Sequence, residues 1–168
     1  MVWQYILTII SAVLLFGFAA LCVYKFGWKT CYSAYGKFWD KGDINTWSLV
    51  TILSAFIIVP AILEASNNSP YQFVGFLAPV SLLLVGATPN YATDKTQAII
   101  HPIGALSAVV FIVLYSILVP HLLWIVLSIV AIAALVGYIQ RINGRKTIIF
   151  WLEMAMYMST YVILFIII

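Results

Sequence analysis

The carboxyl group of Glu153 is the first candidate for chemistry, because it stands in a long apolar stretch near the end of the chain. Tyr157 and Thr160 follow at intervals of four and three residues, so a helix would carry all three side chains on one polar face. A charged residue near the centre of a bilayer costs about 2.5–3.5 kcal/mol on insertion scales. We therefore expect Glu153 to face the interior of a helix bundle. It would serve there either as a proton, ion or headgroup site, or as a carboxyl group that joins helices through hydrogen bonds.

His101 and Asp94 form the second candidate group, with Asp94 seven residues before His101. A histidine and the carboxyl groups of Asp94 and Glu153 could carry out acid–base chemistry or hold a metal if the fold brings them together. The alternative is that His101 is a hydrogen-bonded residue at the start of a helix. The spacing alone does not distinguish the two interpretations.

No pattern in the sequence predicts a metal site, a cofactor or a nucleic-acid interface. Cys22 and Cys31 have no nearby histidine, and a full predicted helix separates His101 from His121. A Gly-rich phosphate loop, a nucleophile elbow and a Cys-x-x-Cys motif are all absent. We therefore expect no metal, no cofactor and no nucleic acid, and we look to the membrane for partners.

The composition places most of this chain in a membrane. Of its 168 residues, 65% are hydrophobic and 8% are charged, whereas a soluble domain has roughly 25% charged residues. The hydrophobic residues come in long runs, which is typical of helices that face lipid. We expect one all-α transmembrane domain over residues 1–168.

Six segments are long and apolar enough to cross a membrane, for which about 20 residues are needed. The third is the shortest and ends before Pro89, and Pro120 separates the fourth and fifth. Asn143-Gly144 marks the turn before the sixth. The segments run over residues 3–24, 46–65, 72–88, 97–119, 121–140 and 147–168. The sequence thus predicts a bundle of six transmembrane helices.

The basic residues indicate how this bundle is oriented. All eight lie in the first, third and fifth connecting loops: Lys25, Lys29, Lys37 and Lys41, then Lys95, then Arg141, Arg145 and Lys146. Basic residues are retained on the cytoplasmic side during insertion. We therefore expect these three loops in the cytoplasm and both termini on the outer side.

The first loop carries an aromatic stripe, which consists of Trp28, Tyr32, Tyr35 and Trp39. Spacings of four, three and four put these rings on one helical face. The stripe predicts a short amphipathic helix at the membrane interface. The alternative is that the rings pack on the end of the bundle itself.

Gly104 and Ala108 follow His101 in the fourth segment. Small residues at this spacing allow a second helix to approach closely. The partner would be another helix of the bundle or a second copy of the chain.

The stretch from Ile62 to Ala108 contains the elements ILEAS, YQFVGFLAPVSLLLVGATPNY and IIHPIGALSA. It resembles a group of small uncharacterised six-helix membrane proteins encoded by bacteria and their phages. More distantly, it is similar to the DRAM-type six-helix membrane family. The shared positions are Glu64, Gln72, Phe73, Val85, Gly86, Ala87, Pro89, His101 and Ala105, with Ser33, Ala34 and Tyr35 upstream. The resemblance implies six helices and a bacterial inner membrane and adds weight to His101, but it implies no activity.

These observations favour a non-catalytic membrane protein that binds lipid or a small amphiphile in the cytoplasmic half of the bundle, near His101 and Glu153. The first alternative is an intramembrane enzyme acting on a lipid-like substrate, which requires His101, Asp94 and Glu153 to converge on a cavity. The second is a small proton-coupled transporter, for which inverted repeats or broken helices are expected. Pro60 and Pro79, inside the second and third segments, are compatible with broken helices.

Overall fold

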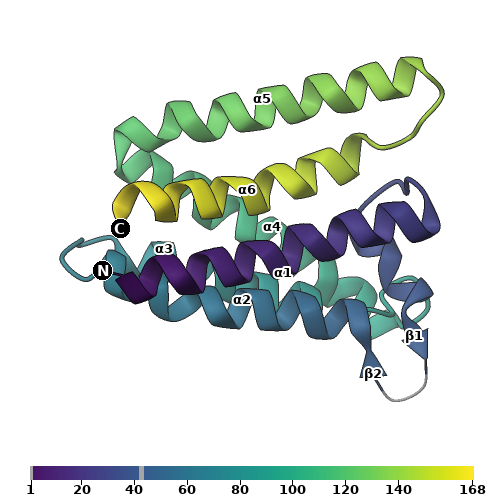
Figure 1. The fold of residues 1–168 in the computed structure, drawn as a ribbon, viewed down its shortest axis with the longest axis horizontal. Coiled ribbons are helices and arrows are strands. Elements are labelled where there is room, and N and C mark those ends of the chain that lie inside the picture. Colours follow the sequence, from purple (N-terminus) through teal and green to yellow (C-terminus); the bar gives the residue numbers. More distant parts are fainter. Residues whose placement is uncertain (1, 42–43) are drawn as a thin grey trace.

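The computed structural model describes residues 2–41 and 44–168, which form six α-helices joined by short connections (Figure 1). A 3₁₀-helix and an antiparallel two-stranded hairpin lie between the first two α-helices. In chain order the elements are α1 (Val2–Phe26), η1 (Ser33–Phe38), β1 (Asp40–Lys41), β2 (Ile44–Asn45), α2 (Thr46–Ala65), α3 (Gln72–Gly86), α4 (Lys95–Leu118), α5 (Pro120–Ile142) and α6 (Ile148–Ile167).

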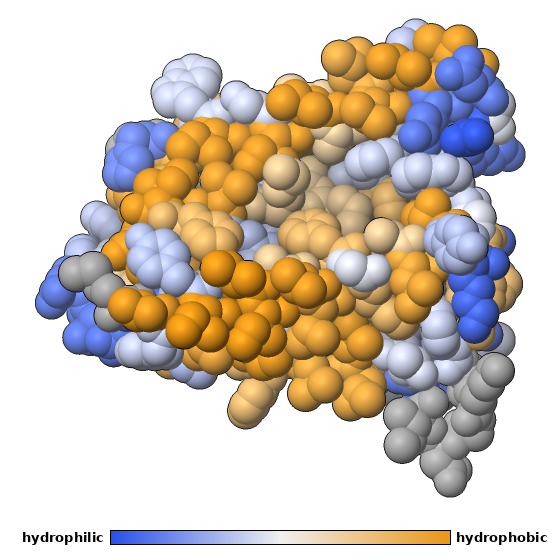
Figure 2. Space-filling view, viewed as in Figure 1, coloured by the Kyte–Doolittle hydropathy of each residue, from blue (hydrophilic) through white to orange (hydrophobic). Residues whose placement is uncertain are grey.

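The helices run side by side with alternating direction, so connections of one kind gather at one end (Figure 1). The α1–α2, α3–α4 and α5–α6 connections lie at the right of the view, and both chain ends lie at the left. All eight Lys and Arg residues belong to the right-hand end, which we call the basic end. Figure 2 shows an apolar band between two hydrophilic ends. This distribution is the one expected of a protein whose sides face lipid.

Five helices of the described chain, α1, α2, α4, α5 and α6, are long and apolar enough to cross a membrane. The sixth, α3, has 15 residues and is shorter. It ends at Gly86, two residues before the predicted end, because the Thr88 hydroxyl donates to the carbonyls of Leu84 and Val85 at 2.9 and 3.0 Å. These side-chain bonds satisfy carbonyls that the helix leaves free. The fold is thus an all-α membrane bundle.

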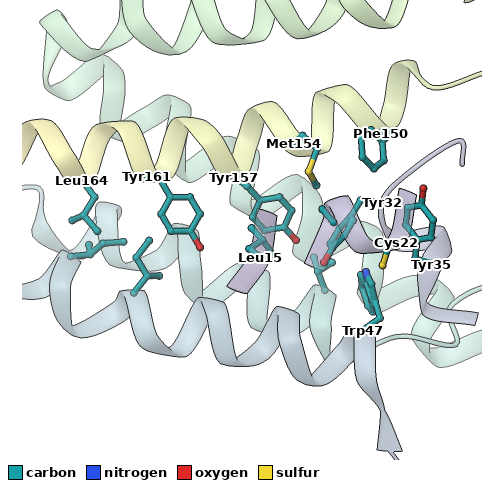
Figure 3. Close-up of a cluster of buried hydrophobic side chains, with 14 of the residues drawn as sticks. Leu15, Cys22, Tyr32, Tyr35, Trp47, Phe150, Met154, Tyr157, Tyr161 and Leu164 are labelled. Carbon is teal, nitrogen blue, oxygen red and sulfur yellow. The ribbon is translucent and has the colours of Figure 1, made fainter. Parts of the chain in front are cut away.

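The core follows the length of α6, which is the most buried of the five long helices. Figure 3 shows Phe150, Met154, Tyr157, Tyr161 and Leu164 of α6 pointing toward α1, α2 and the α1–α2 connection. Each of the helices α1 to α4 packs mainly against its neighbours in sequence, and α6 closes the bundle by contacting α1, α2 and α4.

The aromatic stripe packs on the basic end of the bundle, as in the second of the two interpretations of the sequence. The only helix in the described part of this connection is the six-residue η1, which is a 3₁₀-helix and not an amphipathic α-helix. Tyr32 and Tyr35 are fully buried, Trp28 packs on Phe150, and Trp39 packs on Phe18 and Phe26 of α1. Burial of these rings against the bundle is more favourable than their exposure at the membrane surface because each removes a large apolar area from water.

The helix α5 stands apart from the rest of the bundle and packs chiefly against α6 (Figure 1). The two helices come closest at Gly137, where an added Cβ would lie 2.8 Å from the Cα of Ile148. Toward the other end of α5, Leu122 and Val126 are buried in a small cluster with Ile163 of α6. Between these contacts α5 leaves space on both of its sides.

Replacing Gly137 by alanine is expected to destabilise the protein by roughly 1–3 kcal/mol, because the new methyl group would force α5 away from α6. The matched control is Gly17→Ala in α1, where an added Cβ meets nothing within 4 Å. The thermal unfolding midpoint of each purified variant in detergent measures the difference. Equal unfolding midpoints of the two variants would show that the contact between Gly137 and Ile148 does not hold α5 against α6.

Candidate ligand-binding site

The carboxyl group of Glu153 is held by the backbone of the first connection. The amide of Tyr32 donates to Oε2, and the amide of Ser33 donates to the same oxygen at 3.4 Å. The Ser33 hydroxyl donates to Oε1 at 3.1 Å. Glu153 therefore receives three hydrogen bonds from two consecutive residues, which compensates for the cost of placing a carboxyl group in an apolar helix.

A further hydrogen bond, one turn earlier on α6, fixes the same connection. The amide of Phe150 donates to the carbonyl of Thr30 at 2.9 Å. Together with the bonds at Glu153, it holds residues 30–33 across the first turns of α6. The tyrosine that follows in this segment, Tyr35, donates its hydroxyl to the carbonyl of Gly27 at 2.7 Å. These hydrogen bonds hold the connection against α6, so that it covers the basic end of the bundle.

Tyr91 links this cluster to His101. Its hydroxyl lies 3.4 Å from the Ser33 hydroxyl and 3.7 Å from Sγ of Cys31. Its ring stacks on the imidazole of His101, with the ring centroids 4.0 Å apart. The Thr88 hydroxyl lies 2.9 Å from Nδ1 of His101. Because Thr88 donates its proton to backbone carbonyls, its oxygen accepts from His101, which assigns the Nδ1–H tautomer.

The structure places the polar residues singled out from the sequence in different parts of the protein. Glu153 and Tyr157 line one cavity, and His101 lies behind Tyr91, outside the lining of that cavity. Asp94 is exposed and caps α4 by accepting the amide of Gln97 at 2.8 Å. Thr160 donates to the carbonyl of Met156 within its own helix. His101 and Glu153 are therefore neighbours in one network, and Asp94 is apart from them.

The small residues of α4 are used within the chain. An added Cβ on Gly104 would lie 2.9 Å from Cβ of Leu84 and 3.0 Å from the carbonyl oxygen of Ser81, so Gly104 is where α4 approaches α3. Ala108 is buried and lines the cavity beside Glu153.

A cavity of about 370 Å³ opens beside Glu153, between α4, α5 and α6, and we call it the Glu153 cavity. Its floor at the basic end carries the polar side chains Tyr32, Ser33, Trp47 and Glu153. Its walls are aliphatic, with Val109 and Val113 from α4 and Leu127 and Val130 from α5 among them. The side chains of Val109 and Leu127 are 37% and 48% exposed, so the cavity opens sideways toward the surrounding lipid.

Two buried polar groups on the floor have no hydrogen-bond partner among the described residues. They are the hydroxyl of Tyr32 and the indole N–H of Trp47, on side chains that are 1% and 0% exposed. The hydroxyl of Thr51, next to that of Tyr32, donates to the carbonyl of Trp47 at 2.9 Å. Leaving a buried donor unpaired costs about 1–3 kcal/mol.

The tyrosines of the connecting loops remain protonated hydrogen-bond donors at neutral pH. Burial raises the pKa of Tyr35 and of Tyr91 to about 12, and hydrogen bonds to each hydroxyl oppose this effect only in part. Burial raises the pKa of Tyr32 still further above its ordinary value. The residues at the floor of the cavity therefore carry O–H and N–H donors close to the acceptor oxygens of Glu153.

Four residues of the site, Ser33, Tyr91, Trp47 and Thr88, were not candidates for chemistry in the sequence. The sequence marks Ser33 only as part of a Ser-x-Tyr element. At Trp47, Thr88 and Tyr91, any apolar or turn residue would fit the sequence pattern of helices and turns equally well. Among the described residues, no three His, Cys, Asp or Glu side chains come together as a metal site.

Comparison of the chain with models of protein families, with curated proteins and with solved structures gives no match. We therefore infer function from the geometry of the site.

Removing the carboxyl group with Glu153→Ala is expected to release the α1–α2 connection from α6. Three hydrogen bonds of about 0.5–1.5 kcal/mol each are lost, which corresponds to roughly a tenfold or greater change in the opening equilibrium. Cys31 lies in this connection, so its alkylation by N-ethylmaleimide should accelerate by about that factor. Mass spectrometry of the Cys31 peptide measures the rate.

Ser33→Ala removes a single hydrogen bond to Glu153 and should give a smaller acceleration. Glu64→Ala is the control, because Glu64 is exposed near the opposite end of α2. Alkylation of Cys31 at the same rate in Glu153→Ala and Glu64→Ala would contradict the docking of the connection by Glu153.

Proposed function

We propose that this chain is an integral membrane protein that binds a small amphiphile in the Glu153 cavity. The observation that carries the proposal is the arrangement of the cavity: an aliphatic channel open toward lipid, with polar residues gathered at its floor. A pocket with apolar walls and a few convergent polar groups is the usual form of a small-molecule site. The ligand would place its chain between α4 and α5 and its head on the floor.

The chemistry of the floor favours an uncharged head that carries an acceptor oxygen. The indole N–H of Trp47 is only a donor, and the Tyr32 hydroxyl is a donor at neutral pH. An ester, ketone or alcohol head would meet these residues without the cost of burying a charge. An anionic head would bring a charge into a cavity whose lining, within the described chain, has no basic side chain, and this cost disfavours fatty acids and acidic phospholipids.

The same geometry gives less support to an intramembrane enzyme. That interpretation requires His101, Asp94 and Glu153 to face one cavity. Asp94 caps α4 on the exposed surface, and His101 is covered by the ring of Tyr91. The polar contacts of Glu153, including the Ser33 hydroxyl, hold a loop in place, and no histidine or second carboxyl group lines the cavity among the described residues. Binding is therefore the function that the site supports best.

We further propose that all six α-helices cross the inner membrane of a bacterium, with the basic end in the cytoplasm. The shortness of α3 is compatible with a local approach of its ends to the polar headgroups. The concentration of Lys and Arg at one end supports the orientation. The resemblance to small six-helix membrane proteins of bacteria and phages supports the location.

A reporter fused after Ile168 tests this topology. Because Ile168 lies at the end opposite the basic residues, alkaline phosphatase fused there should be active in the periplasm of a bacterial host. Green fluorescent protein at the same position should stay dark. A fluorescent fusion with inactive phosphatase would reverse the proposed orientation.

A photoactivatable monoacylglycerol, with a diazirine in its chain, tests binding in the Glu153 cavity. Crosslinks in the purified protein should map to peptides that contain Val113, Val130 or Met156. Val109→Trp should reduce this labelling severalfold, because the larger side chain would fill the lateral opening.

The control for this experiment is Val110→Trp, one residue along α4, which is 49% exposed and lies outside the lining of the cavity. This variant should label like the unmodified protein. Equal labelling of the Val109→Trp and Val110→Trp proteins, or crosslinks spread evenly over the outer faces of the helices, would remove the support for a specific site.

A further inference from the structure

A second apolar groove lies between α1 and α5, on the other side of α6 from the Glu153 cavity. Its volume is about 610 Å³, and its walls include Ala20 and Val23 from α1, Ile132 and Val136 from α5, and Met154 and Met158 from α6. Figure 2 shows the hollow between the upper ridge, which is α5, and the lower ridge, which is α1. We call this hollow the α1–α5 groove.

The groove continues at the basic end into a polar pocket of about 460 Å³. Lys29, Arg145 and Lys146 line this pocket, together with Thr30 and Thr147. Trp28 lines both the pocket and the groove, so its ring marks the junction between them. Neither of the two segments that form the pocket, residues 28–30 and 144–147, contains an acidic residue. The pocket thus has three positive charges and no negative charge from its own walls.

The cations of this pocket differ in how they are held. The ammonium group of Lys29 lies 4.6 Å from the ring centroid of Phe38, so an aromatic face positions it. Arg145 and Lys146 are exposed at the start of α6. The Thr147 hydroxyl donates to Gln140 at 2.6 Å and does not cap α6, so the positive end of the helix dipole adds to the charge at the pocket wall.

We infer that the α1–α5 groove binds an anionic phospholipid of the surrounding membrane, with the phosphate in the basic pocket and an acyl chain along the groove. The order of the parts matches such a lipid: cations, then an interfacial tryptophan, then an aliphatic channel. Retention of basic loops in the cytoplasm accounts for the sign of the charge. This retention does not account for the position of three cations at the mouth of the α1–α5 groove.

This inference does not depend on the proposed amphiphile site. The two sites lie on different sides of α6 and differ at their polar ends, where one has the carboxyl group of Glu153 and the other has three basic side chains. They would therefore select different lipids, and their labelling would appear on different peptides.

The experiment uses a phosphatidylglycerol with a diazirine in one acyl chain, diluted into phosphatidylcholine nanodiscs that contain the full chain. A phosphatidylcholine with the same diazirine chain serves as the comparison probe. Labelling of peptides that contain Ile132, Val136 or Met158 should be at least about fivefold greater with phosphatidylglycerol, because each cation near the surface contributes on the order of 1 kcal/mol to anionic lipid binding.

The double variant Arg145→Gln/Lys146→Gln should lose most of this preference. Lys37→Gln/Lys95→Gln is the matched control, because it removes the same charge from the basic end but from outside the pocket, and it should retain the preference. A steric pair avoids any change of charge: Ile132→Trp should block the groove, and Leu135→Trp, outside the lining, should not.

Equal labelling by the two lipids, or an equal loss in the two charge variants, would overturn the inference. Displacement of the phosphatidylglycerol by inorganic phosphate at equal concentration would assign the basic pocket to free phosphate, and this result would also overturn it. Loss of the monoacylglycerol crosslinks alone would count against the proposed function and leave this groove unaffected.

Discussion

The requirement that Glu153 be hydrogen-bonded within an apolar helix organises the basic end of this protein. Its carboxyl group lies among aliphatic and aromatic side chains and takes its donors from the α1–α2 connection, through the amides of Tyr32 and Ser33. The connection is thereby fixed over the bundle, and the rings of Tyr32, Tyr35 and Trp47 become fully buried. Tyr32 and Trp47, together with Ser33 and Glu153, form the floor of a cavity. The need to hydrogen-bond Glu153 thus fixes the α1–α2 connection over the basic end and also forms the candidate site.

The position of α5 has a second consequence. Because α5 packs closely on α6 and only lightly on the remaining helices, α6 separates two spaces that the bundle does not fill. A well-packed membrane bundle would bring small residues together at each interface, and Gly137 provides this contact at one end of α5 only. The lining of both spaces is aliphatic, so lipid chains satisfy them as well as helix side chains would. Their polar ends differ in charge, which suits them to different headgroups.

Much of the fold could be predicted from the sequence, because run length and the distribution of basic residues are strong signals in membrane proteins. All six predicted segments form helices, and five of these are long and apolar enough to span a membrane. The site was less predictable. Glu153 was identifiable as a lone carboxyl group, but its donors are backbone amides, which any residue carries. Asp94 resembled a partner of His101 and instead caps a helix, since both roles use the same residue type. The periodicity of the aromatic stripe suggested an α-helix, whereas tertiary packing bends the segment into a loop and a 3₁₀ turn.

The most direct test of this account is an experimental structure of the protein crystallised from a lipidic mesophase, at a resolution that shows individual lipid chains. We predict that the carboxyl group of Glu153 accepts the amides of Tyr32 and Ser33. We also predict that elongated density runs from Trp47 and Tyr32 outward between α4 and α5. A structure in which α5 closes directly on α4, or in which the side chain of Glu153 points toward bulk lipid, would contradict the account.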